Sequence, residues 1–205
     1  MSSTEISTKH CIGFVGLGTM GLPMARNLVA SGFKLQVHTR SRLAETHKNL
    51  KGAMPCQSPL DAAKGCDALM ICVSNDDAVE MVLFGSQGAQ DNLREGSFVI
   101  DLSTISPNKA RSFSERLARR KVTYLDAPVT GGSEGAIEGT LTIFLGGDQQ
   151  SLRKVSPILK AIGNDIYSFG EVGKGQEVKA INQVLVAGTY AAVAEAIALG
   201  EKLKE

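Results

Sequence analysis

The sequence lacks several features that would each mark a class of protein. It has no tryptophan, and 22 basic residues nearly balance 21 acidic ones, which gives a formal charge of +1. This balance excludes nucleic-acid binding through bulk positive charge. No apolar run approaches the roughly 18 residues of a membrane span, and residues 1–10 lack the apolar segment of a secretory signal. We therefore expect a cytoplasmic protein without nucleic-acid or membrane partners.

Cysteine is also scarce, and the four cysteines contain no Cys-x-x-Cys pair. This absence argues against a zinc site and against a thioredoxin-type redox site, and no metal is expected. Cys11 and Cys72 lie inside apolar runs, so we expect them to be small buried residues of a reduced protein.

Short apolar runs alternate with amphipathic stretches through most of the chain. The predicted strands are Cys11–Val15, Lys34–His38, Asp67–Val73, Phe98–Leu102, Val122–Leu125, Leu141–Leu145 and Asp165–Phe169. The predicted helices include Met20–Ala30, Asp76–Phe84, Pro107–Arg119 and Gln149–Ala161. Strands separated by helices of this length are typical of βαβ units and a mainly parallel sheet. We predict an α/β domain over residues 1–172.

The pattern changes at Gly173, after which no strand is predicted. Apolar residues then recur at helical spacing as far as Ala198, which predicts one helix of about 30 residues, roughly 45 Å long. Such a helix has too much apolar surface to stand alone. We interpret residues 173–205 as the first element of another domain or of a subunit interface.

A glycine motif follows the first predicted strand and opens the first predicted helix. Gly16 permits a tight turn, Gly18 lets the backbone approach a pyrophosphate, and Gly21 allows close helix–strand packing. The intervening residues are Leu17, Thr19 and Met20. A glycine-rich turn without a ligand is the structural alternative, but this context is that of a dinucleotide site. We predict a doubly wound fold of the Rossmann type.

The end of the second predicted strand bears on the choice of cofactor. An NAD-specific site places an acid there, whereas this chain has Thr39, Arg40 and Ser41. Arg40 and the two hydroxyls are suited to a 2′-phosphate, so NADP(H) is favoured and NAD(H) remains possible. A solvated surface arginine is the alternative.

Two further segments carry polar groups suited to chemistry. Thr130, Gly131 and Gly132 follow a predicted strand, where their N–H groups are suited to holding a carboxylate, although a plain glycine loop has the same sequence. Lys179, Asn182 and Gln183 stand at i, i+3 and i+4 on one helix face. Partial desolvation there would lower the pKa of the amine toward a range useful for proton transfer. A solvated lysine is the alternative.

Together these motifs resemble the β-hydroxyacid dehydrogenase family, which includes 3-hydroxyisobutyrate dehydrogenases and tartronate semialdehyde reductases. The segment from Phe14 to Leu28 resembles the family's N-terminal motif, Asp126–Gly132 its substrate-binding motif, and Gly173–Gln183 its catalytic motif. Asp101-Leu102-Ser103-Thr104 resembles the loop whose threonine approaches the nicotinamide ribose. The four motifs occur in order over essentially the whole chain.

The resemblance implies an NAD(P)-dependent oxidoreductase that interconverts a short β-hydroxyacid and its semialdehyde. Lys179 would be the general acid/base, and Asn182, with Gln183 beside it, would orient the substrate whose carboxylate the Thr130 loop holds. The cofactor groove would also be lined by Val73, Ser74, Asn75 and Thr104.

The resemblance also sets out alternatives. The family has a second, all-helical domain that begins with the long helix, so residues 173–205 are expected to be the start of an incomplete helical domain, of which a fragment and a reduced paralogue are both possible sources. A homo-oligomer is expected to form through residues 175–205. A catalytically weak or inactive NADP-binding module is the main alternative. Another alternative is a relative of 6-phosphogluconate or imine reductases. The lysine motif argues against an imine reductase, and the lack of basic residues in Thr130–Glu138 argues against a phosphosugar substrate.

Overall fold

The computed structural model describes residues 5–40 and 50–203. Its main layer is a six-stranded parallel sheet in the order β3-β2-β1-β4-β5-β6. The strands are β1 (Cys11–Val15), β2 (Lys34–His38), β3 (Ala53–Pro55), β4 (Ala68–Ile71), β5 (Phe98–Asp101) and β6 (Thr123–Asp126). The order reverses between β1 and β4, the switch point at which open α/β sheets bind ligands. The predicted Rossmann-type fold is therefore confirmed.

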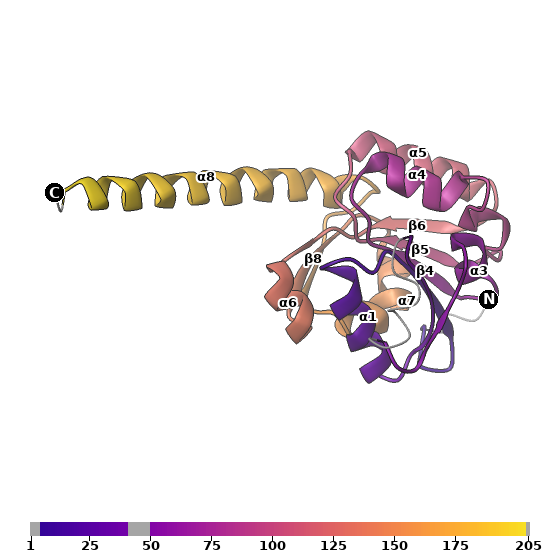
Figure 1. The fold of residues 1–205 in the computed structure, drawn as a ribbon. Helices are drawn as coiled ribbons and strands as arrows, with labels where there is room; N and C mark the ends of the chain where they lie inside the picture. The colour runs from indigo at the N-terminus through magenta and orange to yellow at the C-terminus, as the bar shows by residue number, and fades with distance from the viewer. Residues whose placement is uncertain (1–4, 41–49, 204–205) are drawn as a thin grey trace.

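Helices cover both faces of this sheet (Figure 1). The helices α1 (Gly21–Ala30) and α7 (Gln149–Lys160) pack on one face, while α3 (Pro59–Ala63), α4 (Asp76–Phe84) and α5 (Pro107–Ala118) pack on the other. All the residues of β4 and β5 are buried, as expected of strands covered on both faces. The start of α5 follows local capping rules, since Ser106 accepts from the N–H of Lys109 just before Pro107.

The sequence pattern did not reveal a second, smaller sheet of order β7-β8-β9. The strand β8 (Leu141–Leu145) pairs with β7 (Val129–Thr130) in antiparallel and with β9 (Gly163–Ser168) in parallel orientation. The short helix α6 (Gly132–Glu138) connects β7 to β8. Two predicted strands, β8 and β9, thus belong to the second sheet and not to the main one. The sequence did not indicate this sheet, because the two-residue β7 is too short to show a periodicity.

The expected burial of the cysteines is partly wrong. Cys66 is fully buried and Cys56 is nearly so, whereas Cys11 and Cys72 keep partial exposure. Cys11 is the first residue of β1, at the amino-terminal end of the strand, and Cys72 lies just beyond the carboxyl end of β4. An apolar run predicts that a strand is buried, but it does not show whether the residues at the two ends of the strand are covered by neighbouring elements.

The chain ends in a single long helix, α8 (Lys174–Lys202), which extends away from the domain (Figure 1). Gly175, Gln176 and Lys179 are buried in its first turns, whereas most residues from Ala180 onward are exposed. By length and composition α8 would suffice to cross a membrane, contrary to the expectation that no segment approaches that size. This is weak evidence, because core helices of water-soluble proteins pass the same test.

The side chain of Asp126, at the end of β6, holds the start of α8. One carboxylate oxygen accepts from the N–H of Gly173 at 2.7 Å, and the other accepts from the N–H of Gln176 at 2.9 Å. These N–H groups belong to the helix end that has no intrahelical partners and a positive dipole, so the carboxylate satisfies both demands. Burial raises the pKa of Asp126, while the two N–H donors oppose that rise.

We predict that Asp126→Asn loosens the first turn of α8. An amide offers one acceptor and turns an N–H₂ toward the second donor, which should lower the free energy of unfolding by about 1–3 kcal/mol. Hydrogen exchange should show faster exchange of the Gly173 and Gln176 amides. Glu177→Gln is the matched control, because Glu177 lies in the same turn and makes only partly exposed ion pairs with Arg111 and Lys174. Unchanged exchange in Asp126→Asn would contradict this role.

Candidate active site

The glycine loop between β1 and α1 is shaped for close approach of a ligand. Gly16 has φ of +100°, and a side chain on it would collide with the carbonyl of Cys72 at the end of β4. A side chain on Gly21 would collide with the Gly16 carbonyl, whereas the space around Gly18 is open to 4 Å. Thr19 is exposed, and Leu17 and Met20 pack partly against the core. The loop thus presents backbone N–H groups and the start of α1 without side-chain cover, as a pyrophosphate requires.

The end of β2 lies beside this loop. The N–H of Gly16 donates to the carbonyl of His38 at 2.9 Å, which fixes the loop against β2. Thr39 is half-buried and Arg40 is exposed directly after that contact. The predicted contribution of Ser41 lies outside the described residues. Arg40 is therefore an exposed residue just beyond the contact between β2 and the glycine loop.

The segment after β4 supplies backbone more than side chains. The N–H of Val73 donates to the hydroxyl of Ser103 at 3.0 Å. The Asn75 side chain caps α4 by accepting from the N–H of Ala78 at 2.9 Å, and Ser74 is exposed between them. Asn75 thus has a structural role that the sequence analysis did not consider.

Thr104 is exposed on the loop after β5, and the side chain of Gln176 holds the residues on either side of it. The Gln176 amide accepts from the N–H of Ile105 at 3.1 Å and donates to the carbonyl of Ser103 at 2.8 Å. Gln176 is only 1% exposed. Its two hydrogen bonds attach the first turns of α8 to the Thr104 loop.

The buried carboxylate of Asp101 also holds the Thr104 loop. Asp101 accepts from the hydroxyl of Tyr124 at 2.7 Å and from the N–H of Ser103 at 2.9 Å. Burial raises the pKa of Asp101 to about 6, while these donors oppose that rise. The Thr104 loop is consequently held from both sides, by Asp101 and by Gln176.

The Thr130 loop approaches α8 from the second sheet. Thr130 is half-buried, and Gly131 and Gly132 are exposed with φ of +126° and +66°, a conformation suited to glycine. The amide of Asn182 donates to the hydroxyl of Thr130 at 3.4 Å and to the side-chain oxygen of Gln183 at 3.3 Å. Gln183 itself is exposed, so Asn182 is the residue that links α8 to this loop.

Lys179 lies on α8 between these two contacts. Gln176, Lys179 and Asn182 follow one another at three-residue intervals on one side of the helix, over roughly 9 Å. Lys179 is 7% exposed, and burial lowers the pKa of its amine. Along α8, Lys179 is therefore placed between the residue that holds the Thr104 loop and the residue that contacts Thr130, and it is desolvated there.

Sequence reasoning missed the two residues that hold this arrangement in place, Asp126 and Gln176. Both lie inside the quoted motifs, yet they act across 47 to 73 residues of sequence. The available signal was a polar residue within an otherwise buried segment, but this signal does not predict which residue it binds.

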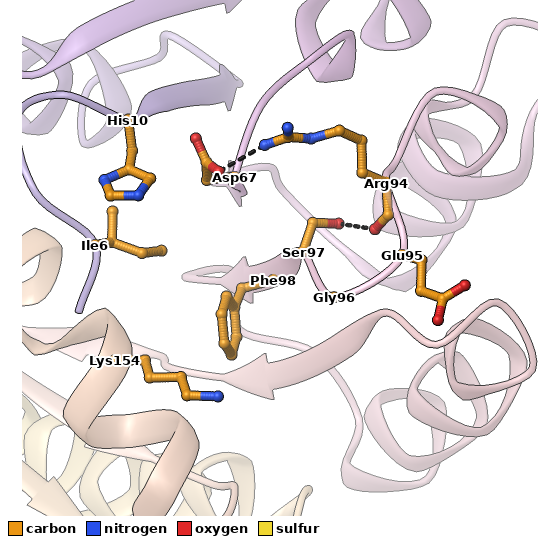
Figure 2. Close-up of a pocket in the computed structure, with 9 residues that line it drawn as sticks. All are labelled: Ile6, His10, Asp67, Arg94, Glu95, Gly96, Ser97, Phe98 and Lys154. Atoms are coloured by element: carbon orange, nitrogen blue, oxygen red, sulfur yellow. Dashed lines mark hydrogen bonds and ion pairs between the residues drawn. The ribbon is translucent and has the colours of Figure 1, made fainter. Parts of the chain in front are cut away.

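Two further features of the described residues were considered as functional sites, namely metal-ligating groups and a surface pocket. Within residues 5–40 and 50–203, no group of three or more His, Cys, Asp or Glu residues is placed to hold a metal ion. A pocket of about 320 Å³ lies at the opposite edge of the main sheet, near the amino ends of β1, β4 and β5 (Figure 2).

Comparisons with known proteins agree with this geometry. Residues 11–170 match the family model described as the NAD binding domain of 6-phosphogluconate dehydrogenase. The chain is 38% identical over 191 residues to 2-hydroxy-3-oxopropionate reductase of Escherichia coli (strain K12), covering 93% of this chain and 65% of that protein. It is 36% identical over 191 residues to 2-(hydroxymethyl)glutarate dehydrogenase of Eubacterium barkeri, covering 93% and 64%.

Comparison with solved structures agrees with the sequence comparisons. The structure of Mycobacterium tuberculosis 3-hydroxyisobutyrate dehydrogenase with L-serine superposes with a TM-score of 0.86 at 31% identity, over 95% of this chain and 66% of that one. The chain thus spans about two thirds of the length of these relatives. Its domain match and its relatives show that this chain belongs to the β-hydroxyacid dehydrogenase family, and that residues 11–170 are its nicotinamide-dinucleotide-binding domain.

Proposed function

We propose that this chain is the cofactor-binding and proton-transferring part of an NAD(P)-dependent oxidoreductase, which interconverts a short β-hydroxyacid and its semialdehyde. The substrate would be of the 3-hydroxyisobutyrate or tartronate semialdehyde/glycerate type. In this proposal residues 1–172 are the dinucleotide-binding domain and residues 173–205 are an interdomain helix.

One observation carries the proposal: along α8, Lys179 lies between the contacts with the Thr104 loop and the Thr130 loop. Gln176 fixes the Thr104 loop on one side, and Asn182 contacts Thr130 on the other. A substrate held by its carboxylate at the Thr130 loop would therefore have its reacting carbon near both Lys179 and the cofactor groove.

The cofactor fits the chain because the glycine loop leaves open the space that a pyrophosphate needs. When bound, the nicotinamide ring supplies or accepts the hydride. In the oxidative direction the neutral Nζ of Lys179 accepts the hydroxyl proton, and in the reductive direction its ammonium donates a proton to the carbonyl oxygen. Asn182 donates a hydrogen bond that orients this oxygen, and the N–H groups of Gly131 and Gly132 hold the carboxylate.

We predict that Lys179→Ala lowers kcat by about 10²-fold or more while the dissociation constant of the cofactor stays unchanged, because a general acid/base is lost. Activity would be assayed with 3-hydroxyisobutyrate, glycerate, 4-hydroxybutyrate and their semialdehydes, with both cofactors. In the unmodified chain, oxidative activity should increase with pH through the pKa of Lys179, which lies below its ordinary value of 10.5.

Lys174→Ala is the matched control, since Lys174 is exposed in the same helix and pairs with Glu177 at 2.7 Å. Full activity of Lys179→Ala would remove Lys179 from the mechanism. Tight cofactor binding without turnover of any tested substrate would favour the second candidate, a weakly active or inactive NADP-binding module. The uncovered apolar residues of α8 beyond Lys179 are the observation that favours this second candidate.

The proposed cofactor preference is NADP(H), because Arg40 is exposed beside the glycine loop and residues 37–41 contain no acid. We predict that Arg40→Ala weakens NADPH binding by about 10-fold or more, the loss of a charge-assisted hydrogen bond, and leaves NADH binding unchanged. Fluorescence titration of the chain measures both dissociation constants without requiring turnover. Arg153→Ala is the control, because Arg153 is an exposed arginine on the outer side of α7. Equal affinity of the unmodified chain for NADH and NADPH would contradict the preference.

We also propose that α8 mediates a homo-oligomer through residues 175–205. The helix exposes a run of large apolar side chains, each at least half exposed: Ile181, Val184, Leu185, Tyr190, Val193, Ile197, Leu199 and Leu203. An apolar surface of this size is a mark of an interaction site.

We predict that the unmodified chain elutes as a dimer or larger species and that Leu185→Glu shifts it toward the monomer, because burying an unpaired charge is costly. Light scattering coupled to size-exclusion chromatography measures the mass. Met81→Glu is the control, because Met81 is equally exposed on α4. A monodisperse monomer of the unmodified chain at high concentration would contradict the proposal.

The proposed location is the cytoplasm. All four cysteines are free, which is typical of a reducing compartment.

A further inference from the structure

Two cysteines, Cys11 and Cys66, meet at the amino-terminal ends of the main-sheet strands, opposite the candidate active site. Cys11 is the first residue of β1, Cys66 lies two residues before the start of β4, and their Sγ atoms are 3.3 Å apart. A third cysteine, Cys56, lies further off and contacts Gln36 with its Sγ at 3.9 Å from the amide oxygen. Cys11 and Cys66 therefore form a pair, although the sequence separates them by 55 residues.

Backbone hydrogen bonds hold the pair together. The N–H of Asp67 donates to the carbonyl of Cys11 at 2.8 Å, and the N–H of Cys11 donates to the carboxylate of Asp67 at 3.1 Å. Because Asp67 directly follows Cys66, these bonds keep the two cysteines side by side. A disulfide, with an S–S bond of about 2.05 Å, requires the sulfur atoms to approach by only about 1.2 Å.

The surroundings divide the roles of the two thiols. Hydrogen bonds from Cys66 and from the Gln36 amide, the latter at 3.1 Å, lower the pKa of Cys11, and the nearby Arg94 adds to this while burial and Asp67 oppose it. Its hydrogen bond with Cys11 and its burial raise the pKa of Cys66, whose thiol also donates to the carbonyl of Ala62 at 3.3 Å. Cys11 is thus the more readily deprotonated thiol of the pair, and Cys66 is the one that keeps its proton.

The edge of the sheet at which the pair lies is open to small molecules. Cys11 is partly exposed, whereas Cys66 is fully buried. The neighbours of the pair in sequence, His10 and Asp67, line the pocket of about 320 Å³ (Figure 2). Figure 2 also shows Arg94 reaching across to pair with Asp67.

We propose that Cys11 and Cys66 are a dithiol modification site, which a peroxide oxidises to an intramolecular disulfide. The Cys11 thiolate attacks one peroxide oxygen, the O–O bond breaks, and Cys11 becomes a sulfenic acid while the other oxygen leaves as water after taking a proton. The Cys66 sulfur then attacks the Cys11 sulfur, the S–O bond breaks, and the hydroxyl leaves with the Cys66 proton as a second water. Two electrons pass from the two thiols to the peroxide.

The disulfide would enclose the first half of the dinucleotide site within a covalent loop. The enclosed segment contains the glycine loop, α1, β2 and Arg40. A cross-link over a loop of this length stabilises a fold chiefly by restricting the unfolded chain. For a chain of this size we expect the Tm to rise by roughly 5–10 °C.

Peptide mapping identifies the bond. The chain would be treated with hydrogen peroxide, its free thiols alkylated, and the product digested with trypsin without reduction. We expect residues 10–26 to be cross-linked to residues 65–94. The second peptide contains Cys72 as well as Cys66, so Cys72→Ser should keep the cross-link and Cys66→Ser should lose it. Cys56 falls in a separate peptide, residues 52–64.

Thermal unfolding supplies an independent readout. Peroxide should raise the Tm of the unmodified chain and of Cys56→Ser and Cys72→Ser, and dithiothreitol should reverse the rise. Cys11→Ser and Cys66→Ser should show no rise, and Cys66→Ala replaces the latter if the buried serine prevents folding.

Three results would overturn the proposal. One is a cross-link that survives Cys66→Ser, and another is a bond between residues 10–26 and 52–64. The third is oxidation of Cys11 to a sulfinic acid, or a disulfide between two chains, with no bond inside the chain.

Discussion

The carboxylate of Asp126 holds the start of α8, and the candidate site depends on that contact. It accepts from Gly173 and Gln176 at the helix end where backbone donors lack partners. Fixing this end fixes the direction of α8 and the rotation of its first turns. Gln176 then reaches the loop around Thr104, and Asn182, about 9 Å further along, reaches Thr130. One buried carboxylate thus joins the main sheet to the helix that carries Lys179, and Asn182 on that helix reaches the second sheet.

The burial of Lys179 follows from the same arrangement. An amine on a free helix would be solvated, and its pKa would keep the ordinary value. The first turns of α8 instead lie against the end of the domain, so Lys179 is desolvated while residues two turns further on are exposed. The chemistry of the lysine is therefore a property of where α8 is anchored, more than of the sequence around the lysine.

Local patterns sufficed for most of the fold. The predicted bounds of β1, β2 and β8 agree with the structure, because buried runs ended by turn residues carry a strong signal. The pairing of β8 with β7 and β9 was not predictable, because β7 has only two residues. The same limit applies to the site. Lys179 and Asn182 could be named from helical spacing and a family resemblance, whereas the roles of Asp126 and Gln176 depend on contacts between segments far apart in the sequence.

The parallel sheet explains why the candidate active site and the cysteine pair lie apart. All six strands run in one direction, so their carboxyl ends and the loops that follow them gather at one edge, where the glycine loop and the loop around Thr104 lie. Their amino ends gather at the other edge, which brings Cys11 beside Cys66. Because both cysteines flank the same βαβ unit that carries the glycine loop, a bond between them would constrain that unit without occupying the ligand edge.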